Sequence, residues 1–299
     1  MTDRNGQAGS DRLAVLPQYL LPKQALTQLA GLIARAKGGA ATTALIRWFI
    51  QRYGVNMAEA AEPDPSAYRC FNDFFTRALN PGARPLARAE LVCPVDGAIS
   101  QFGAIHNGRV FQAKGHDYSA AALLGGDAAL AAHFHGGHFA TLYLSPKDYH
   151  RIHMPCAGRL LRMVHVPGNL FSVNPTTARG VPGLFARNER LVCVFEGLEG
   201  SLRGRPWVNV LVGATIVGSM ATVWHGLVNP PRPGSVRDWS YAGQPIELSQ
   251  GAEMGRFLLG STVVLLFPPG PLHFNPTWQA TGDVRMGQLM ADMPVAGAA

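Results

Sequence analysis

Cysteine is scarce in this sequence, and its four cysteines are far apart. Cys70, Cys93, Cys156 and Cys193 form no Cys-x-x-Cys pair. Small disulfide-rich domains and structural zinc sites need closely spaced cysteines. The sequence therefore indicates neither class of protein and favours a reducing compartment.

The chain also lacks a convincing membrane-spanning or secretory segment. Residues 206–231 carry no charge if histidine is neutral, but they are rich in Gly, Thr and Val. A spanning helix needs about 20 predominantly apolar residues, so we expect two buried strands joined near Gly213–Gly218 and no transmembrane helix. Residues 1–23 contain neither the apolar core nor the small-residue cleavage site of a signal peptide.

Charge is sparse and mostly of one sign. Charged residues make up 15% of the chain, and the net charge is +7. Residues 1–60 hold seven Lys or Arg against three acidic residues, so much of the excess lies near the N-terminus. Such a bias suits nucleic acid or an anionic membrane. No base-stacking motif or Lys/Arg cluster favours nucleic acid, so we expect a membrane surface.

Glycine and proline are abundant, with 34 and 22 residues respectively. From Leu91 onward, short apolar runs alternate with Gly, Pro and Asn turns, which predicts a mainly antiparallel β body. The first dozen residues are expected to be disordered. We predict an α+β fold, with a helical segment over residues 1–66 and a β-rich catalytic domain over residues 67–299.

Two amphipathic helices are expected in the N-terminal segment, one after Pro22 and one after Gly39. Apolar faces with cationic flanks are typical of helices that lie on a membrane. A helix packed on the protein's own core has the same pattern, so both interpretations stay open. The apolar faces comprise Leu26, Leu29, Ala30 and Ile33 in the first helix, and Leu45, Ile46, Phe49, Ile50 and Tyr53 in the second.

An unusual interruption occurs in the apolar run of residues 256–267. Gly260 and Ser261 lie in the middle of this β-branched stretch. Glycine weakens a strand and usually marks a bulge or a close backbone approach. An ordinary bulged core strand fits these residues. A Gly-Ser pair also permits the serine hydroxyl to attack the preceding carbonyl, so that the chain cuts itself.

Polar motifs in the β body supply candidate catalytic groups. Asp96 lies in a Val-Asp-Gly turn, and His150 and His153 are three residues apart in Tyr149-His-Arg-Ile-His-Met-Pro155. Neither this pair nor the loose cluster of His133, His135 and His138 has an obvious third ligand, so we expect no metal. The stretches Phe171-Ser-Val-Asn174 and Leu184-Phe-Ala-Arg-Asn-Glu-Arg190 either line a pocket or form turns.

Asp96, His153 and Ser261 supply an orienting acid, a base and a nucleophile. A serine hydrolase that acts on a lipid with this triad is therefore an alternative function. Ser261 lacks the Gly-x-Ser-x-Gly elbow of the α/β-hydrolases. A metal-dependent lipid enzyme, a non-catalytic membrane adaptor and a pyruvoyl decarboxylase of a soluble amino acid are further alternatives.

These motifs together resemble those of the bacterial phosphatidylserine decarboxylases. The resemblance rests on Val-Asp-Gly, Tyr-His-Arg-Ile-His-Met-Pro, Phe-Ser-Val-Asn, Phe-Ala-Arg-Asn-Glu-Arg, Val-Gly-Ala-Thr-Ile-Val-Gly-Ser and Leu-Gly-Ser-Thr, and it extends from Tyr68 to Gly270. It implies self-cleavage between Gly260 and Ser261, with His153 as base oriented by Asp96. Ser261 would become a covalent pyruvoyl group.

The resemblance also implies the reaction and its partners. The pyruvoyl group would form a Schiff base with phosphatidylserine, and carbon dioxide and phosphatidylethanolamine would leave. His150, with an ordinary pKa near 6.5, would be the proton donor, assisted by Tyr143, while Ser172 and Asn174 would contact the headgroup. A large chain (1–260) and a small chain (261–299) would form a heterodimer that dimerises further. The enzyme would be peripheral on the cytoplasmic face of the inner membrane.

Overall fold

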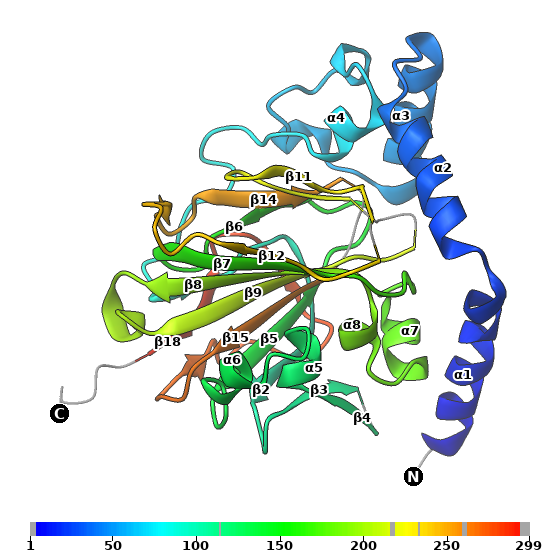
Figure 1. The fold of residues 1–299 in the computed structure, drawn as a ribbon. Coiled ribbons are helices and arrows are strands. Elements are labelled where there is room, and N and C mark those ends of the chain that lie inside the picture. The colour runs from blue at the N-terminus through cyan, green and yellow to red at the C-terminus, as the bar shows by residue number, and fades with distance from the viewer. Residues whose placement is uncertain (1–3, 114, 216–218, 233, 259–261, 294–299) are drawn as a thin grey trace.

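The computed structural model describes residues 4–113, 115–215, 219–232, 234–258 and 262–293. It consists of a β body with helices along one side and beyond one end (Figure 1). Every pairing between its described strands is antiparallel. The predicted α+β fold, with mainly antiparallel sheets and an N-terminal helical segment, is confirmed.

The largest sheet has nine strands in the order β12-β7-β8-β9-β15-β5-β2-β17, with β13 paired to β7. Its central strand, β15, comes from the apolar run that follows Ser261, and it pairs with β5 on one side and β9 on the other. The strands are β2 (Gly97–Ala104), β5 (His138–Tyr143), β7 (Gly158–Val166), β8 (Arg190–Gly197), β9 (Pro206–Val212), β12 (Arg237–Ser240), β13 (Glu247–Leu248), β15 (Thr262–Phe267) and β17 (Asp283–Val284).

Three smaller sheets complete the body. A four-stranded sheet has the order β11-β10-β14-β6, a three-stranded sheet has the order β1-β18-β16, and β3 pairs with β4. The two strands expected around Gly213–Gly218 are present as β9 and β10. The strands of these sheets are β1 (Leu91–Val92), β3 (Arg109–Ala113), β4 (His116–Ser119), β6 (Arg151–His153), β10 (Met220–Thr222), β11 (Gly226–Asn229), β14 (Glu253–Phe257), β16 (His273–Phe274) and β18 (Leu289–Asp292).

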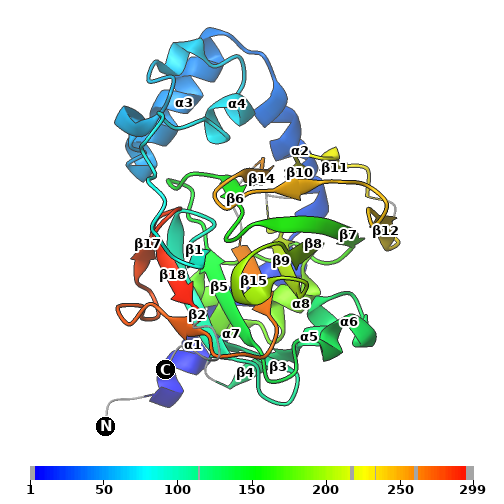
Figure 2. The same ribbon diagram turned by 90° about the vertical axis from the view of Figure 1, so that its left-hand side faces the viewer.

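The nine-stranded sheet is covered on both faces, which explains why β15 is buried at every position and apolar from Val263 onward. Side chains alternate across a strand. Val263 and Leu265 accordingly pack into a core shared with the four-stranded and three-stranded sheets, whereas Val264 and Leu266 pack into a second core shared with helices. Those helices are α5 (Ala120–Leu123), α6 (Ala128–Ala132), α7 (Pro175–Gly180) and α8 (Leu184–Arg187). Figure 2 shows α5 and α6 close to the hairpin of β3 and β4.

The N-terminal segment contains three helices, α1 (Arg4–Leu20), α2 (Lys23–Arg35) and α3 (Ala40–Tyr53). The two expected helices are confirmed as α2 and α3. The expectation of disorder over the first dozen residues is wrong from Arg4 onward. Packing on the β body explains the difference, because Asp11 pairs with Arg179 of α7 at 2.7 Å.

A small separate core joins the N-terminal helices to the rest of the chain. Ile46 of α3 is fully buried there against the phenylalanines of α4 (Phe71–Phe75). This core includes residues on both sides of position 66, and the division into domains at 66/67 stays a prediction. Three short 3₁₀ helices, η1 (Met57–Glu59), η2 (Pro65–Ala67) and η3 (Gly200–Leu202), complete the described elements.

The two amphipathic helices differ in how their apolar faces are covered: α3 packs on the protein's own core, whereas membrane binding by α2 stays a prediction. Ile46 on the predicted face of α3 is buried, whereas Leu29 and Ile33 on the predicted face of α2 are 56% and 53% exposed. α2 therefore keeps an uncovered apolar face. None of the helices in the described ranges is both long and apolar enough to cross a bilayer.

Candidate active site

Of the chain segments that cross between the nine-stranded and four-stranded sheets, three define the site. They connect β5 to β6, β9 to β10, and β14 to β15. Thr262 at the start of β15 pairs with Tyr143 and Val212. At the other end of the third crossing, the Phe257 and Leu258 amides donate to the carbonyls of His150 and Ser219 at 3.1 and 3.0 Å.

The predicted cleavage bond lies within the third crossing. Gly260 and Ser261 are outside the described residues, so only their flanking residues are placed. These flanks lie beside Tyr143 and His150 on the first crossing, and beside Val212 and Ser219 on the second. The structure therefore brings two of the predicted catalytic residues to the same junction as the chain that precedes and follows the Gly-Ser pair.

His150 is fully buried and presents one free ring nitrogen. Its Nδ1 lies 2.8 Å from the Asp148 carbonyl, which can only accept, so Nδ1 carries the proton. Nε2 is buried and has no hydrogen-bond partner among the described residues. Burial lowers the pKa of His150 to about 3. The expected ordinary pKa is therefore wrong for this arrangement, in which His150 is a neutral base at pH 7.

His153 is held at both ring nitrogens by groups other than Asp96. Nδ1 donates to the Gly251 carbonyl at 2.8 Å, and Nε2 accepts from the Tyr149 hydroxyl at 3.1 Å. Burial lowers the pKa of His153. A neutral imidazole with its lone pair on Nε2 is the form that a general base requires. Its orientation in this structure comes from Gly251 and Tyr149.

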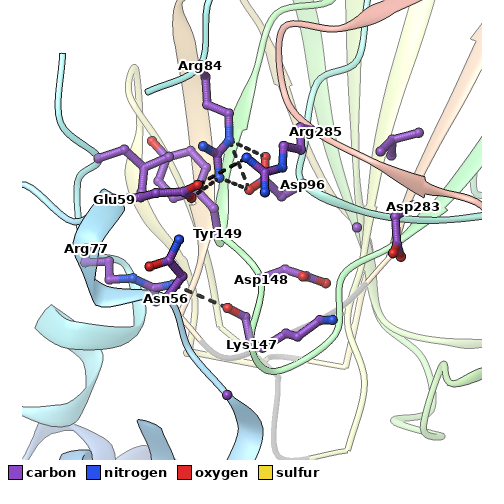
Figure 3. Close-up of a pocket in the computed structure, with 14 residues that line it drawn as sticks. Asn56, Glu59, Arg77, Arg84, Asp96, Lys147, Asp148, Tyr149, Asp283 and Arg285 are labelled. Atoms are coloured by element: carbon purple, nitrogen blue, oxygen red, sulfur yellow. Dashed lines mark hydrogen bonds and ion pairs between the residues drawn. The ribbon is translucent and has the colours of Figure 1, made fainter. Parts of the chain in front are cut away.

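Asp96 instead binds an arginine that the sequence motifs did not single out. Arg84 donates to Asp96 through Nε at 2.9 Å and Nη2 at 2.5 Å. The Met286 amide donates to the same carboxylate at 2.9 Å. Figure 3 shows Arg84 and Asp96 facing each other at one side of a polar cavity of about 230 Å³, with Tyr149 beside them. An Arg within the Pro81–Pro85 turn was the only sequence signal for this role.

A second cavity, of about 470 Å³, adjoins the first. Both are lined by Lys147 and Asp148, and the second also contains Tyr143. Burial raises the pKa of Tyr143, and the charge of Asp148 raises it further. Tyr143 therefore keeps its hydroxyl proton, and it lines a cavity while pairing with Thr262 at the start of β15.

The predicted headgroup residues do not line this second cavity. Val173 and Pro175 are part of its wall, whereas Ser172 and Asn174 are not. The Asn174 side chain accepts from the Thr177 amide at 2.9 Å and caps α7. Asparagine commonly has this role at a helix N-terminus. Contact of Ser172 and Asn174 with a headgroup stays a prediction.

A contiguous polar triplet, residues 188–190, is structural and links several motifs. The Asn188 side chain donates to the carbonyls of Phe171 and Gly213, each at 2.8 Å. Glu189 is buried and pairs with Arg232 at 2.9 Å. A run of three polar residues that leads into the apolar strand β8, with Arg190 as its first residue, was the available signal. The triplet fixes the loop after β9, which forms the second crossing.

The histidines outside the junction form no metal site. His133 and His135 are exposed, and the buried Nδ1 of His138 has no hydrogen-bond partner in the part of the chain that the structure describes. In the described ranges, no three His, Cys, Asp or Glu side chains converge as ligands of a metal ion. All four cysteines are buried and unpaired.

Comparison with known proteins identifies the family. A family model described as phosphatidylserine decarboxylase matches residues 71–292, and a model described as PSD matches residues 13–54. The chain belongs to the phosphatidylserine decarboxylase family. The first match includes Asp96, Tyr143, His150, His153 and Ser261.

Curated relatives are similar over nearly their whole length, and each is named a phosphatidylserine decarboxylase proenzyme. The relative from Albidiferax ferrireducens is 70% identical over 284 residues, which cover 95% of this chain and 98% of the relative. The relative from Azoarcus sp. is 69% identical over 284 residues, with 95% and 97% covered. The relative from Chromobacterium violaceum is 70% identical over 282 residues, with 94% and 99% covered. These matches do not support the serine hydrolase alternative.

Within this decarboxylase family member, large exposed apolar residues concentrate on the N-terminal helices. Leu20 is 89% exposed, Leu13 68%, Leu32 63% and Trp48 55%. Large apolar patches on a protein surface usually mark an interaction site. Lys23 and Arg187 approach the Phe171 ring next to this patch, at 4.5 and 5.2 Å from its centroid.

Proposed function

We propose that this protein decarboxylates phosphatidylserine to phosphatidylethanolamine and carbon dioxide, with a pyruvoyl group made by cleavage between Gly260 and Ser261. Family membership supports the reaction. The observation that supports the site is the junction of the three crossings, where the residues flanking the Gly-Ser pair lie against Tyr143 and His150.

Self-cleavage requires a base near the Ser261 hydroxyl, and His153 is our candidate. Its Nε2 would take the hydroxyl proton, and the Ser261 oxygen would then attack the Gly260 carbonyl, so that an ester replaces the peptide bond. Loss of the Ser261 α-proton would then release the Gly260 carboxylate. Addition of water and loss of ammonia would leave the pyruvoyl group at position 261.

The residues around the junction fit such a group. Among the described residues, the buried Nε2 of His150 and the buried Thr262 hydroxyl have no hydrogen-bond partner. A pyruvoyl group supplies a carbonyl system that withdraws electrons as carbon dioxide leaves. The neutral His150 would bind and move a proton at Nε2, the Tyr143 hydroxyl would orient the substrate, and the packed walls would exclude water.

The two chains would remain one folded unit after cleavage. The small chain would contribute β15, which pairs with β5 and β9 of the large chain. It would also contribute β18, which pairs with β1. Because β15 is the central strand and is fully buried, separation of the chains would dismantle both cores.

We also propose that the protein binds the membrane surface through α1 and α2. The exposed leucines of these helices would insert among acyl chains, while the nearby cations would attract anionic headgroups. The buried, unpaired cysteines suit the reducing side, so we assign the protein to the cytoplasmic face of the inner membrane.

An intact-mass spectrum of the denatured protein tests self-cleavage directly. We expect two chains, with the small one beginning at position 261 and carrying a blocked, ketone-reactive N-terminus. Ser261→Ala should give one uncleaved chain that releases no carbon dioxide from phosphatidylserine vesicles. A single full-length chain in active protein would rule out the pyruvoyl mechanism.

A further inference from the structure

We propose that Arg84 positions the Asp96 carboxylate for self-cleavage and that Glu59 holds Arg84 in place. This inference rests on the proposed function, because it concerns the cleavage step that produces the pyruvoyl group. Arg84 does not touch the reacting atoms, so its role is that of a positioning residue.

Arg84 holds the Asp96 carboxylate through two hydrogen bonds, and we call this paired contact the clamp. Arg84 Nε donates to Oδ1 at 2.9 Å and Nη2 donates to Oδ2 at 2.5 Å, so that the guanidinium and the carboxylate lie fork to fork. The Arg84 side chain is only 6% exposed and that of Asp96 10%. Paired, charge-assisted hydrogen bonds of this kind fix the plane of a carboxylate as well as its place.

Nothing else in the described structure orients the Asp96 side chain to the same degree. Asp96 directly precedes β2, and its other hydrogen bond comes from the Met286 amide at 2.9 Å. His153 offers it no ring N–H, because Nδ1 donates to Gly251 and Nε2 accepts from Tyr149. Without Arg84, one amide would be left to hold a carboxylate at the edge of a polar cavity.

A second acid fixes the arginine. Glu59 of η1 accepts from Arg84 Nη2 at 2.6 Å, and Arg84 Nη1 donates to its neighbour's carbonyl, that of Ala83, at 2.8 Å. The carboxylates of Asp96 and Glu59 raise the pKa of Arg84 further above its ordinary value, so the clamp stays charged. Glu59 also accepts from Arg285 at 3.1 Å. Figure 3 shows Arg84 between the two acids.

The contact with Arg84 holds the negative charge of Asp96 near His153, the proposed base of the cleavage step. The His153 amide donates to the Pro94 carbonyl at 2.8 Å, so the strand that carries His153 runs beside the turn that carries Asp96. Burial lowers the pKa of His153, and the Gly251 carbonyl and the charges of Glu253 and Asp96 act in the opposite direction. Asp96 would therefore stabilise the protonated imidazole that forms when the Ser261 hydroxyl gives its proton to Nε2.

The test follows self-cleavage of freshly synthesised full-length protein over time. Arg84→Gln should slow the appearance of the small chain by at least about tenfold, since misplacing a catalytic group costs about 10- to 100-fold. Arg84→Lys keeps the charge but not the fork, and should give an intermediate rate. Arg69→Gln is the matched control, because Arg69 is exposed, pairs with Asp73 at 3.3 Å and contacts neither Asp96 nor Glu59 among the described residues, and it should cleave at the wild-type rate.

Two further measurements separate positioning from loss of folding. Adding a low concentration of guanidinium to Arg84→Ala should restore part of the cleavage rate, which a purely misfolded variant would not show. Thermal unfolding of each precursor in the Ser261→Ala background reports whether it is folded. A folded Arg84→Gln protein that cleaves as fast as wild type, or faster, would overturn the inference.

The same experiment separates this inference from the proposed function. Cleavage of Ser261→Ala, or no cleavage of the wild type, would contradict the pyruvoyl mechanism itself, whatever Arg84 does. If the wild type cleaves and Ser261→Ala does not, the Arg84 variants alone decide whether the clamp positions Asp96.

Discussion

The His150 ring packs against the Phe75 ring with centroids 4.0 Å apart. Phe75 lies in α4 and belongs to the small core that also contains Ile46 of α3. The small core around α4 therefore supplies one wall of the environment in which the His150 ring is buried. Ala34 of α2 belongs to the same core, so this core links a helix proposed to bind the membrane with the residue proposed to move the proton.

The first prediction concerns the pKa of His150. NMR titration should place it near 3, because burial disfavours the charged imidazole. Phe75→Leu removes the ring that packs on His150 and lets water approach the imidazole, so it should raise the pKa of His150 toward 6.5. Phe71→Leu is the matched control, since Phe71 lies in the same helix and core but makes no ring contact with His150. Equal shifts in both variants would contradict the role of Phe75.

The same depressed pKa predicts a dependence of stability on pH. The unfolded chain binds a proton at His150 below pH 6.5, while the folded chain does so only near pH 3. Stability from this group is therefore complete above pH 6.5 and is lost as the pH falls, by up to about 1.4 kcal/mol per pH unit. Urea unfolding at pH 7 and pH 5 should show a smaller loss for His150→Gln than for wild type.

A third prediction concerns the apolar face of α2. Leu29→Ser with Leu32→Ser should leave the thermal unfolding temperature nearly unchanged, because both side chains are more than half exposed. Binding to phospholipid vesicles should weaken by about tenfold or more, since burying a leucine side chain is worth about 1.5–3 kcal/mol. Leu86→Ser is the control, because Leu86 is 45% exposed and lies outside the N-terminal helices. Unchanged co-sedimentation of the double variant with vesicles would argue against insertion of α2.

The fourth prediction concerns Lys23 and Arg187 and how their binding to a membrane depends on the charge of the lipid headgroups. Burial and the charge of Arg187 lower the pKa of Lys23, so these two cations lie close together. Changing both to Gln should weaken binding to anionic vesicles by about 1 kcal/mol per residue at low salt, with little effect on zwitterionic vesicles. Arg159→Gln is a control, because Arg159 pairs with Glu247 at 3.0 Å. An equal loss on both vesicle types would point to a change in fold.

The sequence determined much of the local structure. The periodicity of α2 and α3 and the Gly-rich break between β9 and β10 depend on residues close together in the chain, so they could be predicted correctly. Helix α1 was missed, because its helical state depends on contacts with α7, such as the pair Asp11–Arg179, 168 residues apart. Sequence periodicity carries no information on such distant contacts.

For the site, too, the sequence determined one part and the tertiary structure determined the other. The sequence motifs indicated Asp96, Tyr143, His150 and His153 as candidate catalytic residues, because each lies in a short distinctive segment. Only the tertiary structure decided their partners: Arg84 on Asp96, Tyr149 and Gly251 on His153, and Phe75 on His150. The physical reason is burial. Which donors remain near a carboxylate, and whether an imidazole stays neutral, depend on the side chains that exclude water from it, and folding brings these from distant parts of the chain.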